Sequence, residues 1–319
     1  TGGYNGHGSS CEPVDMTVDP QGRVLGISGG GYTPWLARIG ANGRCDTAFA
    51  RLGVTGPFAY PYDRVVALSN GSVMAFATYH ESGGQNYYPD CQVFHSDGTG
   101  SAYYDGVGSA SGEHALLSDV TVGPDDRAYF ITRANESIYS ESGFTTVGCL
   151  RPDGTVDSTF ATNGYFVDPS TPLHNNGSCI GIFPNGDLLA VQTIADSLMN
   201  FGLVFNKAQF TRLSHEGALV TTWGTAGKVT TDINGTAALN AAPYCVAMLP
   251  DGGYYLLYNG NGNDTTLLYL AKFLGTGDLD GSFGTNGIVA IDNTDMQFNP
   301  EMAAQPNGDV TIAWDGYFQ

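Results

Sequence analysis

The sequence predicts an all-β fold made of small antiparallel sheets, and three observations support this prediction. A tight-turn hairpin recurs six times along the chain. A second motif, with an aromatic residue and a glycine at fixed distances from a turn glycine, recurs five times. No stretch shows the sustained 3.6-residue spacing of apolar residues that an amphipathic helix requires. Repeats of this length point to solenoids, propellers or arrays, so they decide the architecture.

The hairpin combines a polar turn with two flanking apolar strands. Its six copies are DPQGRVLGIS, ALSNGSVMAF, VGPDDRAYFI, FPNGDLLAVQ, LPDGGYYLLY and QPNGDVTIAW. Five copies have Pro in the same slot, and this residue presets φ for the turn. The glycine that closes the turn supplies a positive φ; these positions are Gly22, Gly71, Gly186, Gly252 and Gly308, with Asp126 in the third copy. Their spacing of 49 to 66 residues defines the repeat.

The second motif follows a turn glycine at the end of the third apolar segment. The anchors are Gly43, Gly98, Gly154, Gly217 and Gly277, and six residues later stand Phe49, Tyr104, Phe160, Trp223 and Phe283. Three residues after the anchor, three repeats carry Asp46, Asp157 and Asp280. An Asp can accept hydrogen bonds from the backbone of its own turn. The aromatic can wedge between neighbouring sheets and bury about 150–250 Å². These structural roles are favoured over a catalytic role for the repeated Asp.

Each repeat therefore contains about four short strands. Radial repetition of four-stranded sheets is the β-propeller architecture, which leaves only short sheet edges. We expect one propeller domain over residues 1–319 with about six four-stranded blades. The expected repeats are residues 14–56, 62–108, 115–167, 178–230, 243–291, and 298–319 together with 1–13.

The sixth repeat contains only two of the four strands. The N-terminal residues 1–13 could close this incomplete blade. Alternatively, another chain supplies the missing strand, because an open sheet edge is a template for strand addition. The second possibility predicts head-to-tail assembly into a fibre or appendage.

Three segments resemble the delta-60 repeat of secreted bacterial proteins: LARIGANGRCDTAF, LRPDGTVDSTFATNGYFV and LAKFLGTGDLDGSFGTNGIV. The first, third and fifth repeats match well, the fourth lacks the Asp and the second is the most degenerate. The resemblance implies a propeller-type surface or extracellular protein. It provides no common catalytic residues.

The charge balance argues against two classes of partner. Asp and Glu outnumber Lys and Arg by 31 to 12, for a net charge of −19. Such a surface repels nucleic acid and anionic lipid, and no run of 18 apolar residues is present to insert in a membrane. Proteins, including further copies of this chain, and neutral glycans are the expected partners. A role of the acidic residues in solubility alone is the simpler alternative.

Six cysteines are spread over the chain without a CxxC pair: Cys11, Cys45, Cys91, Cys149, Cys179 and Cys245. This pattern favours disulfides over zinc binding, with buried thiols as the alternative. Disulfides predict an oxidising, extracellular or cell-surface location. The chain begins without Met or an apolar leader, so we expect a mature product.

Ligand sites are only weakly indicated. The loops between the second and third strands vary most in length, and one of them contains Gln85, Asn86, Tyr87 and Tyr88, which suit sugar stacking and hydrogen bonding. Calcium is the expected cofactor, if one is present, with Asp278 and Asp280 as oxygen ligands; ordinary Asx turns also explain both residues.

The sequence contains none of the usual catalytic signatures: HExxH, a GxSxG elbow and a complete P-loop are all absent. We therefore expect a binding or structural module rather than an enzyme, and one that self-assembles at its incomplete blade if another chain supplies the missing strand. The alternative is a secreted hydrolase or lyase acting on polysaccharide, which is an analogy at the level of the fold only.

Overall fold

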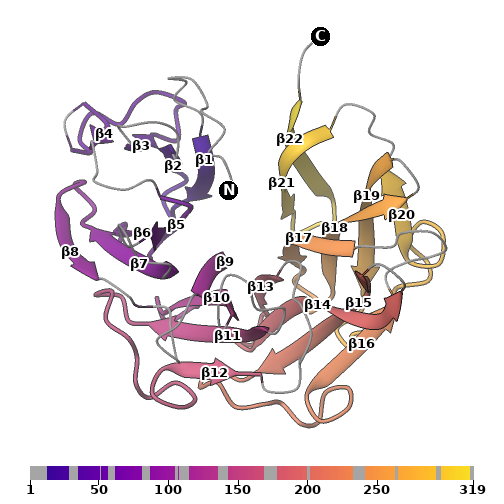
Figure 1. Ribbon diagram of the computed structural model, residues 1–319. Coiled ribbons are helices and arrows are strands. Elements are labelled where there is room, and N and C mark those ends of the chain that lie inside the picture. Colours follow the sequence, from indigo (N-terminus) through magenta and orange to yellow (C-terminus); the bar gives the residue numbers. More distant parts are fainter. Residues whose placement is uncertain are drawn as a thin grey trace. The chain divides into compact units, whose positions relative to one another are not determined.

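The structure is a computed structural model of the chain (Figure 1). It describes residues 13–28, 35–50, 52–56, 62–80, 87–104, 107, 115–135, 143–168, 178–199, 202–232, 241–262, 265–291 and 296–316. All regular elements in these ranges are β-strands. No helix in this part of the chain has the length and apolar character needed to cross a membrane.

The strands form six antiparallel sheets in which neighbours follow chain order. Sheet 1 contains β1 (Pro13–Val18), β2 (Val24–Ser28), β3 (Leu36–Ile39) and β4 (Val54–Thr55). Sheet 2 contains β5 (Arg64–Ala67), β6 (Val73–His80), β7 (Tyr87–Phe94) and β8 (Gly100–Tyr104). Sheet 3 contains β9 (Ala115–Val122), β10 (Ala128–Asn135), β11 (Gly143–Leu150) and β12 (Tyr165–Val167).

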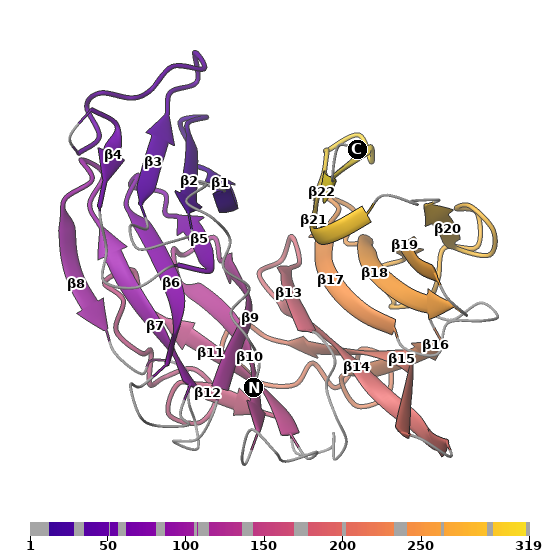
Figure 2. The same ribbon diagram turned by 45° about the horizontal axis from the view of Figure 1, so that its top comes forward.

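The second half of the chain repeats this order. Sheet 4 contains β13 (Ser178–Ile182), β14 (Leu188–Met199), β15 (Gly202–Leu213) and β16 (Lys228–Asp232). Sheet 5 contains β17 (Ala241–Met248), β18 (Tyr254–Gly262), β19 (Thr265–Phe273) and β20 (Ile288–Ile291). Sheet 6 contains only β21 (Met296–Ala304) and β22 (Val310–Gly316). Figure 2 shows the up-and-down course of the strands within the sheets.

The all-β class and the four-stranded antiparallel blade are therefore confirmed. Five complete blades are present instead of about six, because the sixth sheet has two strands among the described residues. The predicted closure by residues 1–13 lies almost wholly outside the described residues. The one described member, Pro13, pairs with Ser28 in sheet 1.

The recurring glycines adopt the backbone conformation for which they were identified. The five hairpin glycines have φ between +72° and +89°, and Asp126 in the remaining hairpin has φ +63°. The five anchor glycines of the second motif have φ between +75° and +92°. An L-residue is strained in this region, so these local signals set the turns independently of long-range packing.

By its contacts the chain divides into two compact units, residues 1–129 with 149–157 and residues 130–148 with 158–319. Sheets 1 and 2 lie in the first unit, sheets 4 to 6 lie in the second, and the boundary runs through sheet 3. Within each unit, consecutive sheets pack face to face through apolar side chains. Leu25, Ile27 and Phe49 of sheet 1 share a buried cluster with Val73 and Phe94 of sheet 2.

The same packing recurs in the second unit. Leu189, Val191 and Phe210 of sheet 4 form a buried cluster with Tyr254 and Phe273 of sheet 5. The Tyr254 and Phe273 rings stack with their centroids 5.0 Å apart. This face-to-face packing of four-stranded sheets is the blade packing of a β-propeller.

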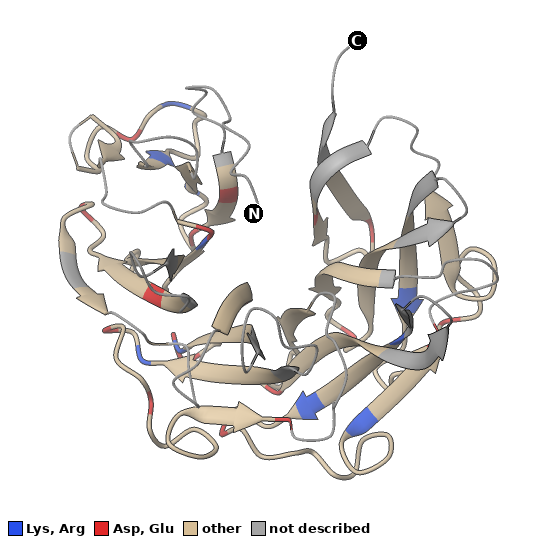
Figure 3. Ribbon diagram, in the orientation of Figure 1, with Lys and Arg blue, Asp and Glu red and all other residues tan. Residues whose placement is uncertain are grey.

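Acidic residues lie largely in turns and at strand ends (Figure 3). Asp97, Asp153 and Asp251 each accept a hydrogen bond from the backbone N–H two residues later, at 2.9–3.0 Å. Such Asx turns replace backbone hydrogen bonds that the turn lacks. Part of the chain's acidity is thus a requirement of its many turns.

The expected disulfides are not present among the cysteines that the structure describes. Cys45, Cys91, Cys149, Cys179 and Cys245 are thiols, and Cys11 lies outside the described residues. One described cysteine belongs to each of the five complete repeats. Cys91, Cys149 and Cys179 are fully buried, so they serve as small apolar residues of a sheet core. Burial raises the pKa of the Cys149 thiol to about 12.

Candidate functional site

The junctions between sheets share one arrangement, in which the motif aromatic of one sheet lies under the anchor-glycine turn of the next. In the first unit, the Ala50 N–H, next to Phe49, donates to the Asp97 carbonyl of sheet 2 at 2.5 Å. In the second unit, the Ala161 N–H donates to the Glu216 carbonyl at 2.7 Å. The turn thus closes over the aromatic and seals the junction from solvent.

The anchor glycine is required at this point by close approach as well as by φ. A Cβ added at Gly217 would lie 2.9 Å from Cε2 of Phe160 and 2.7 Å from Cβ of Ala161. A Cβ at Gly277 would lie 2.8 Å from Cζ2 of Trp223. Three of the motif aromatics are accordingly buried: Phe49, Phe160 and Trp223 have exposed fractions of 0%, 0% and 7%.

Phe283, the motif aromatic of sheet 5, has no such cover from the residues that the structure describes. Sheet 6 has no third and fourth strand among the described residues, so it has no anchor turn to lie over this ring. Phe283 is half-buried, as is Tyr104 of sheet 2, although the Gly154 turn lies against that ring. The inner side of Phe283 packs edge-on against Tyr255, with centroids 5.4 Å apart.

The inner strands of sheet 6 nevertheless dock as in the other sheets. Met302, Ala304, Val310 and Ile312 pack on a buried cluster of sheet 5 that includes Leu257 and Leu270. The Tyr255 hydroxyl also donates to the Gly308 carbonyl at 3.1 Å. Sheet 6 is therefore the beginning of a blade, anchored on one face and, among the described residues, without a strand beyond β22.

Backbone groups of β22 point outward along that edge. The Gln305 N–H donates to the Asp309 carbonyl at the hairpin turn, and the register pairs Ala303 with Thr311 and Met302 with Ile312. Hydrogen-bonded pairs alternate along an antiparallel ladder. The N–H and C=O groups of Val310 and Ile312 therefore point away from β21. This edge is a template for a further strand.

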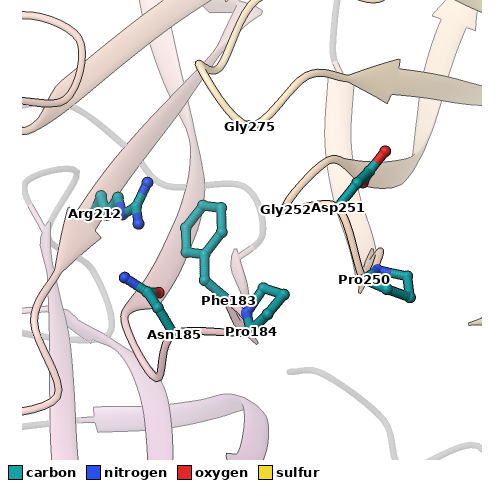
Figure 4. A pocket seen from close by; sticks show the side chains of 8 residues that line it. All are labelled: Phe183, Pro184, Asn185, Arg212, Pro250, Asp251, Gly252 and Gly275. Atoms are coloured by element: carbon teal, nitrogen blue, oxygen red, sulfur yellow. The ribbon is translucent and has the colours of Figure 1, made fainter.

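A pocket of about 370 Å³ lies between the hairpin turns of sheets 4 and 5 (Figure 4). It is lined by Phe183, Pro184, Asn185, Arg212, Pro250, Asp251, Gly252 and Gly275. The Arg212 guanidinium lies 4.1 Å above the centre of the Phe183 ring and pairs with Asp187 at 2.8 Å. The lining thus combines proline rings with an ion-paired guanidinium and the exposed carboxylate of Asp251.

The position of Arg212 follows from the absence of the motif Asp in the fourth repeat. In sheet 1 the corresponding Arg38 pairs with Asp46 at 2.9 Å and donates to the Ser96 carbonyl of sheet 2 at 2.6 Å. Sheet 4 has Val220 at the Asp position. The Trp223 indole N–H instead caps the neighbouring turn, at the Gly275 carbonyl. Arg212 is thereby directed to Asp187, where it forms one wall of the pocket.

The sequence-predicted ligand residues are only partly described. Gln85 and Asn86 lie outside the described residues. Tyr87 and Tyr88 begin β7, where they pair with His80 and Tyr79 of β6, and the Tyr88 side chain is half-buried. The sugar-binding role of these four residues stays a prediction.

Asp278 and Asp280 are engaged in local contacts, and their role as calcium ligands stays a prediction. Asp280 pairs with Lys272 at 2.9 Å and accepts hydrogen bonds from the Ser282 backbone and hydroxyl. The Ser282 and Lys272 hydrogen bonds lower the pKa of Asp280 to about 2. Asp278 accepts from the Thr276 hydroxyl. Calcium takes six to eight oxygen ligands, and no group of three or more candidate metal ligands occurs in the described residues.

A cluster that sequence inspection missed lies on the first strands of the first unit. Asp15 of β1 accepts from the Val65 N–H at 2.7 Å, and Asp63 accepts from the Thr78 N–H at 2.7 Å. Arg64 lies between them and Asp119, whose carboxylate is 3.9 Å away. Burial raises the pKa of Asp15 and of Asp63, although Arg64 acts in the opposite direction. Asp15 and Asp119 join neighbouring sheets, through Val65 and Arg64 of sheet 2, whereas the Asp63 contact lies within sheet 2.

Comparison with known proteins supports the fold and provides no family. No family model matches the sequence, and no curated protein matches it. A protein of unknown function from Dyadobacter fermentans has a similar structure, with a TM-score of 0.53 at 13% identity, over 95% of this chain and 90% of that one.

Two enzymes show a weaker likeness. Virginiamycin B lyase from Staphylococcus aureus has a TM-score of 0.45 at 13% identity, over 95% of this chain and 92% of that one. An endo-arabinase from Bacteroides thetaiotaomicron has a TM-score of 0.45 at 10% identity, over 82% of this chain and 92% of that one. At such identities the likeness concerns the fold, and the delta-60 resemblance stays a prediction.

Proposed function

We propose that the chain is a binding and structural propeller module, extracellular or on a cell surface, whose sixth sheet is completed by strands from another polypeptide. The observation that carries this proposal is the β22 edge, which has no further strand among the described residues. Beside it lies the half-buried Phe283, at the motif position where Phe49, Phe160 and Trp223 are buried. The acidic composition and the resemblance to secreted repeats support the location; the cysteines no longer do, because those described are thiols.

The polypeptide segment that would complete sheet 6 can be specified from the other sheets. It is a third and fourth strand joined by an anchor-glycine turn, because this is what closes the junctions at Phe160 and Trp223. Main-chain hydrogen bonds to the outward groups of Val310 and Ile312 would provide affinity, and the turn over Phe283 would provide specificity.

The test uses a synthetic peptide of residues 202–232, the third and fourth strands of the fourth repeat, added to the purified chain. We expect a fluorescently labelled peptide to bind with a roughly micromolar Kd, measured by anisotropy. The control peptide carries Gly217→Val, which places a β-branched side chain at φ +83° and against the ring below the turn. It should bind at least about tenfold more weakly, a difference of ~1.4 kcal/mol.

Equal binding of the two peptides, or binding of neither, would contradict the proposal. The Phe283→Ala variant adds a check on the protein side. This variant should bind the peptide of residues 202–232 more weakly than the wild type does. Its already weak binding of the control peptide should not change.

A further inference from the structure

The pocket between sheets 4 and 5 has hydrogen-bond donors of Arg212 on one side (Figure 4). The Nε and Nη2 atoms of Arg212 both contact the same oxygen of Asp187, at 2.9 Å and 2.8 Å. The guanidinium also lies on the Phe183 ring, which fixes its plane. Among the described residues, no group accepts a hydrogen bond from its Nη1.

Sheet 1 shows which group accepts this hydrogen bond elsewhere in the repeat. Nη1 of Arg38, at the same repeat position, donates to the Ser96 carbonyl of sheet 2 at 2.6 Å. The corresponding carbonyl of sheet 5 is that of Gly275, two residues before the anchor glycine. The Trp223 indole already donates to it at 2.8 Å. Arg212 therefore keeps N–H groups for an acceptor that enters the pocket.

Asp251 provides an acceptor on the other side of the pocket. Its Oδ1 accepts from the Gly253 N–H at 2.9 Å, and it is in no ion pair within the part of the chain that the structure describes. Three other hairpins have Asn at this position, namely Asn70, Asn185 and Asn307, and each accepts the same backbone hydrogen bond. The turn therefore needs one oxygen only, and the second oxygen of Asp251 is available to a donor.

The lining between these two groups is apolar and has closed backbone turns. Pro184 and Pro250 contribute C–H surface and have no N–H. The N–H groups of Gly186 and Gly252 donate within their own turns. A Cβ added at Gly252 would meet nothing within 4 Å, so the space beside it is open. No run of outward backbone groups is available here to pair with an extended peptide, which disfavours a peptide ligand.

Size and charge restrict the ligand further. The volume of about 370 Å³ lies in the range of small-molecule sites, ~300–1,000 Å³. Arg212 is neutralised by Asp187, so the unpaired Asp251 leaves the pocket with an excess of negative charge, on a chain of net charge −19. This disfavours an anion. Hydroxyl groups both accept and donate hydrogen bonds, as the two sides of the pocket require.

We propose that this pocket binds a neutral sugar unit. One hydroxyl accepts from Arg212, another donates to Asp251, and the C–H face of the ring lies on Pro184 and Pro250. The site is separate from the β22 edge, so the inference does not rest on the proposed strand addition.

The Trp223 indole N–H reports on the pocket, because it is hydrogen-bonded to the carbonyl of Gly275 in the lining. The chain has three tryptophans, whose indole signals in a ¹H–¹⁵N spectrum are assigned with Trp→Phe variants. The probes are the methyl glycosides of glucose, galactose and mannose, and N-acetylglycinamide represents a peptide. At least one glycoside should shift the Trp223 signal with a roughly millimolar Kd, while the Trp35 signal stays unchanged.

Two conservative variants test the assigned hydrogen bonds. Arg212→Lys and Asp251→Asn should each weaken glycoside binding about tenfold, as for the loss of a hydrogen bond to a charged group. Both fit the repeat, because Lys272 occupies the Arg212 position in sheet 5 and Asn occupies the Asp251 position in three hairpins. The controls Arg38→Lys and Asp153→Asn, at turns of other sheets, should leave the Kd unchanged.

The proposal is overturned if no glycoside shifts the Trp223 signal, if only N-acetylglycinamide does, or if the control variants weaken binding as much as the pocket variants. Glycoside binding without binding of the 202–232 peptide would retain this site and remove strand addition. The opposite result would remove this site and retain strand addition.

Discussion

At the scale of single residues, the anchor glycines meet two separate requirements. Each has a positive φ, and some are also in close contact with the sheet before them. The anchor glycine Gly217 and the hairpin glycine Gly252 separate the two effects, because their φ values are nearly equal, at +83° and +86°. A Cβ at Gly217 would clash with Ala161, whereas nothing lies within 4 Å of a Cβ at Gly252.

The Gly217→Ala substitution should therefore destabilise the protein more than Gly252→Ala. We expect Gly252→Ala to cost about 1–2 kcal/mol for the left-handed backbone alone. Gly217→Ala should cost a further ~1–3 kcal/mol for overpacking. Urea unfolding followed by circular dichroism measures both. Equal losses would mean that the turn of sheet 4 shifts freely away from Phe160.

At the scale of the sheet, the structural elements repeat but their surroundings do not. Phe160 and Phe283 occupy the same motif position on the same kind of turn. Phe160 is fully buried under the anchor turn of sheet 4, whereas Phe283 is half-buried beside a sheet with two described strands. Their energetic contributions should differ accordingly, since burial of apolar surface is the main stabilising term.

We expect Phe160→Ala to cost about 3–5 kcal/mol, as for a fully buried Phe, and Phe283→Ala to cost roughly half as much or less. Thermal and urea unfolding of the two variants, compared with the wild type, measure the difference. Addition of the 202–232 peptide should raise the stability of the wild type more than that of the Phe283→Ala variant. A Phe283→Ala loss as large as that of Phe160→Ala would show that the ring is already covered.

At the scale of the whole molecule, the state of the cysteines bears on the compartment in which the chain works. Cys45 is exposed, whereas the other four described thiols are buried. The experiment that tests their state uses a Cys11→Ser variant, because Cys11 lies outside the described residues; five cysteines then remain in the chain. Burial also raises the pKa of Cys91 and of Cys149, so little reactive thiolate forms there at neutral pH.

A thiol reagent should accordingly label one cysteine per native chain rapidly, and five after unfolding in urea without reductant. The Cys45→Ser substitution should remove the rapid labelling. Fewer than five labelled thiols after unfolding would show that disulfides do form, and would restore the cysteine argument for an oxidising compartment.

The sequence alone determined the all-β class, the four-stranded repeat and the positions of its turns. These depend on local chemistry: Pro and Gly set φ at Gly186 and Gly252 whatever the rest of the chain does. Only tertiary structure decided that Asp280 pairs with Lys272, that Arg212 turns to Asp187, and that Ile39 is exposed where Phe273 is buried. Those outcomes depend on which sheet lies beside which, and a repeat pattern is the same at a covered face and at an open one.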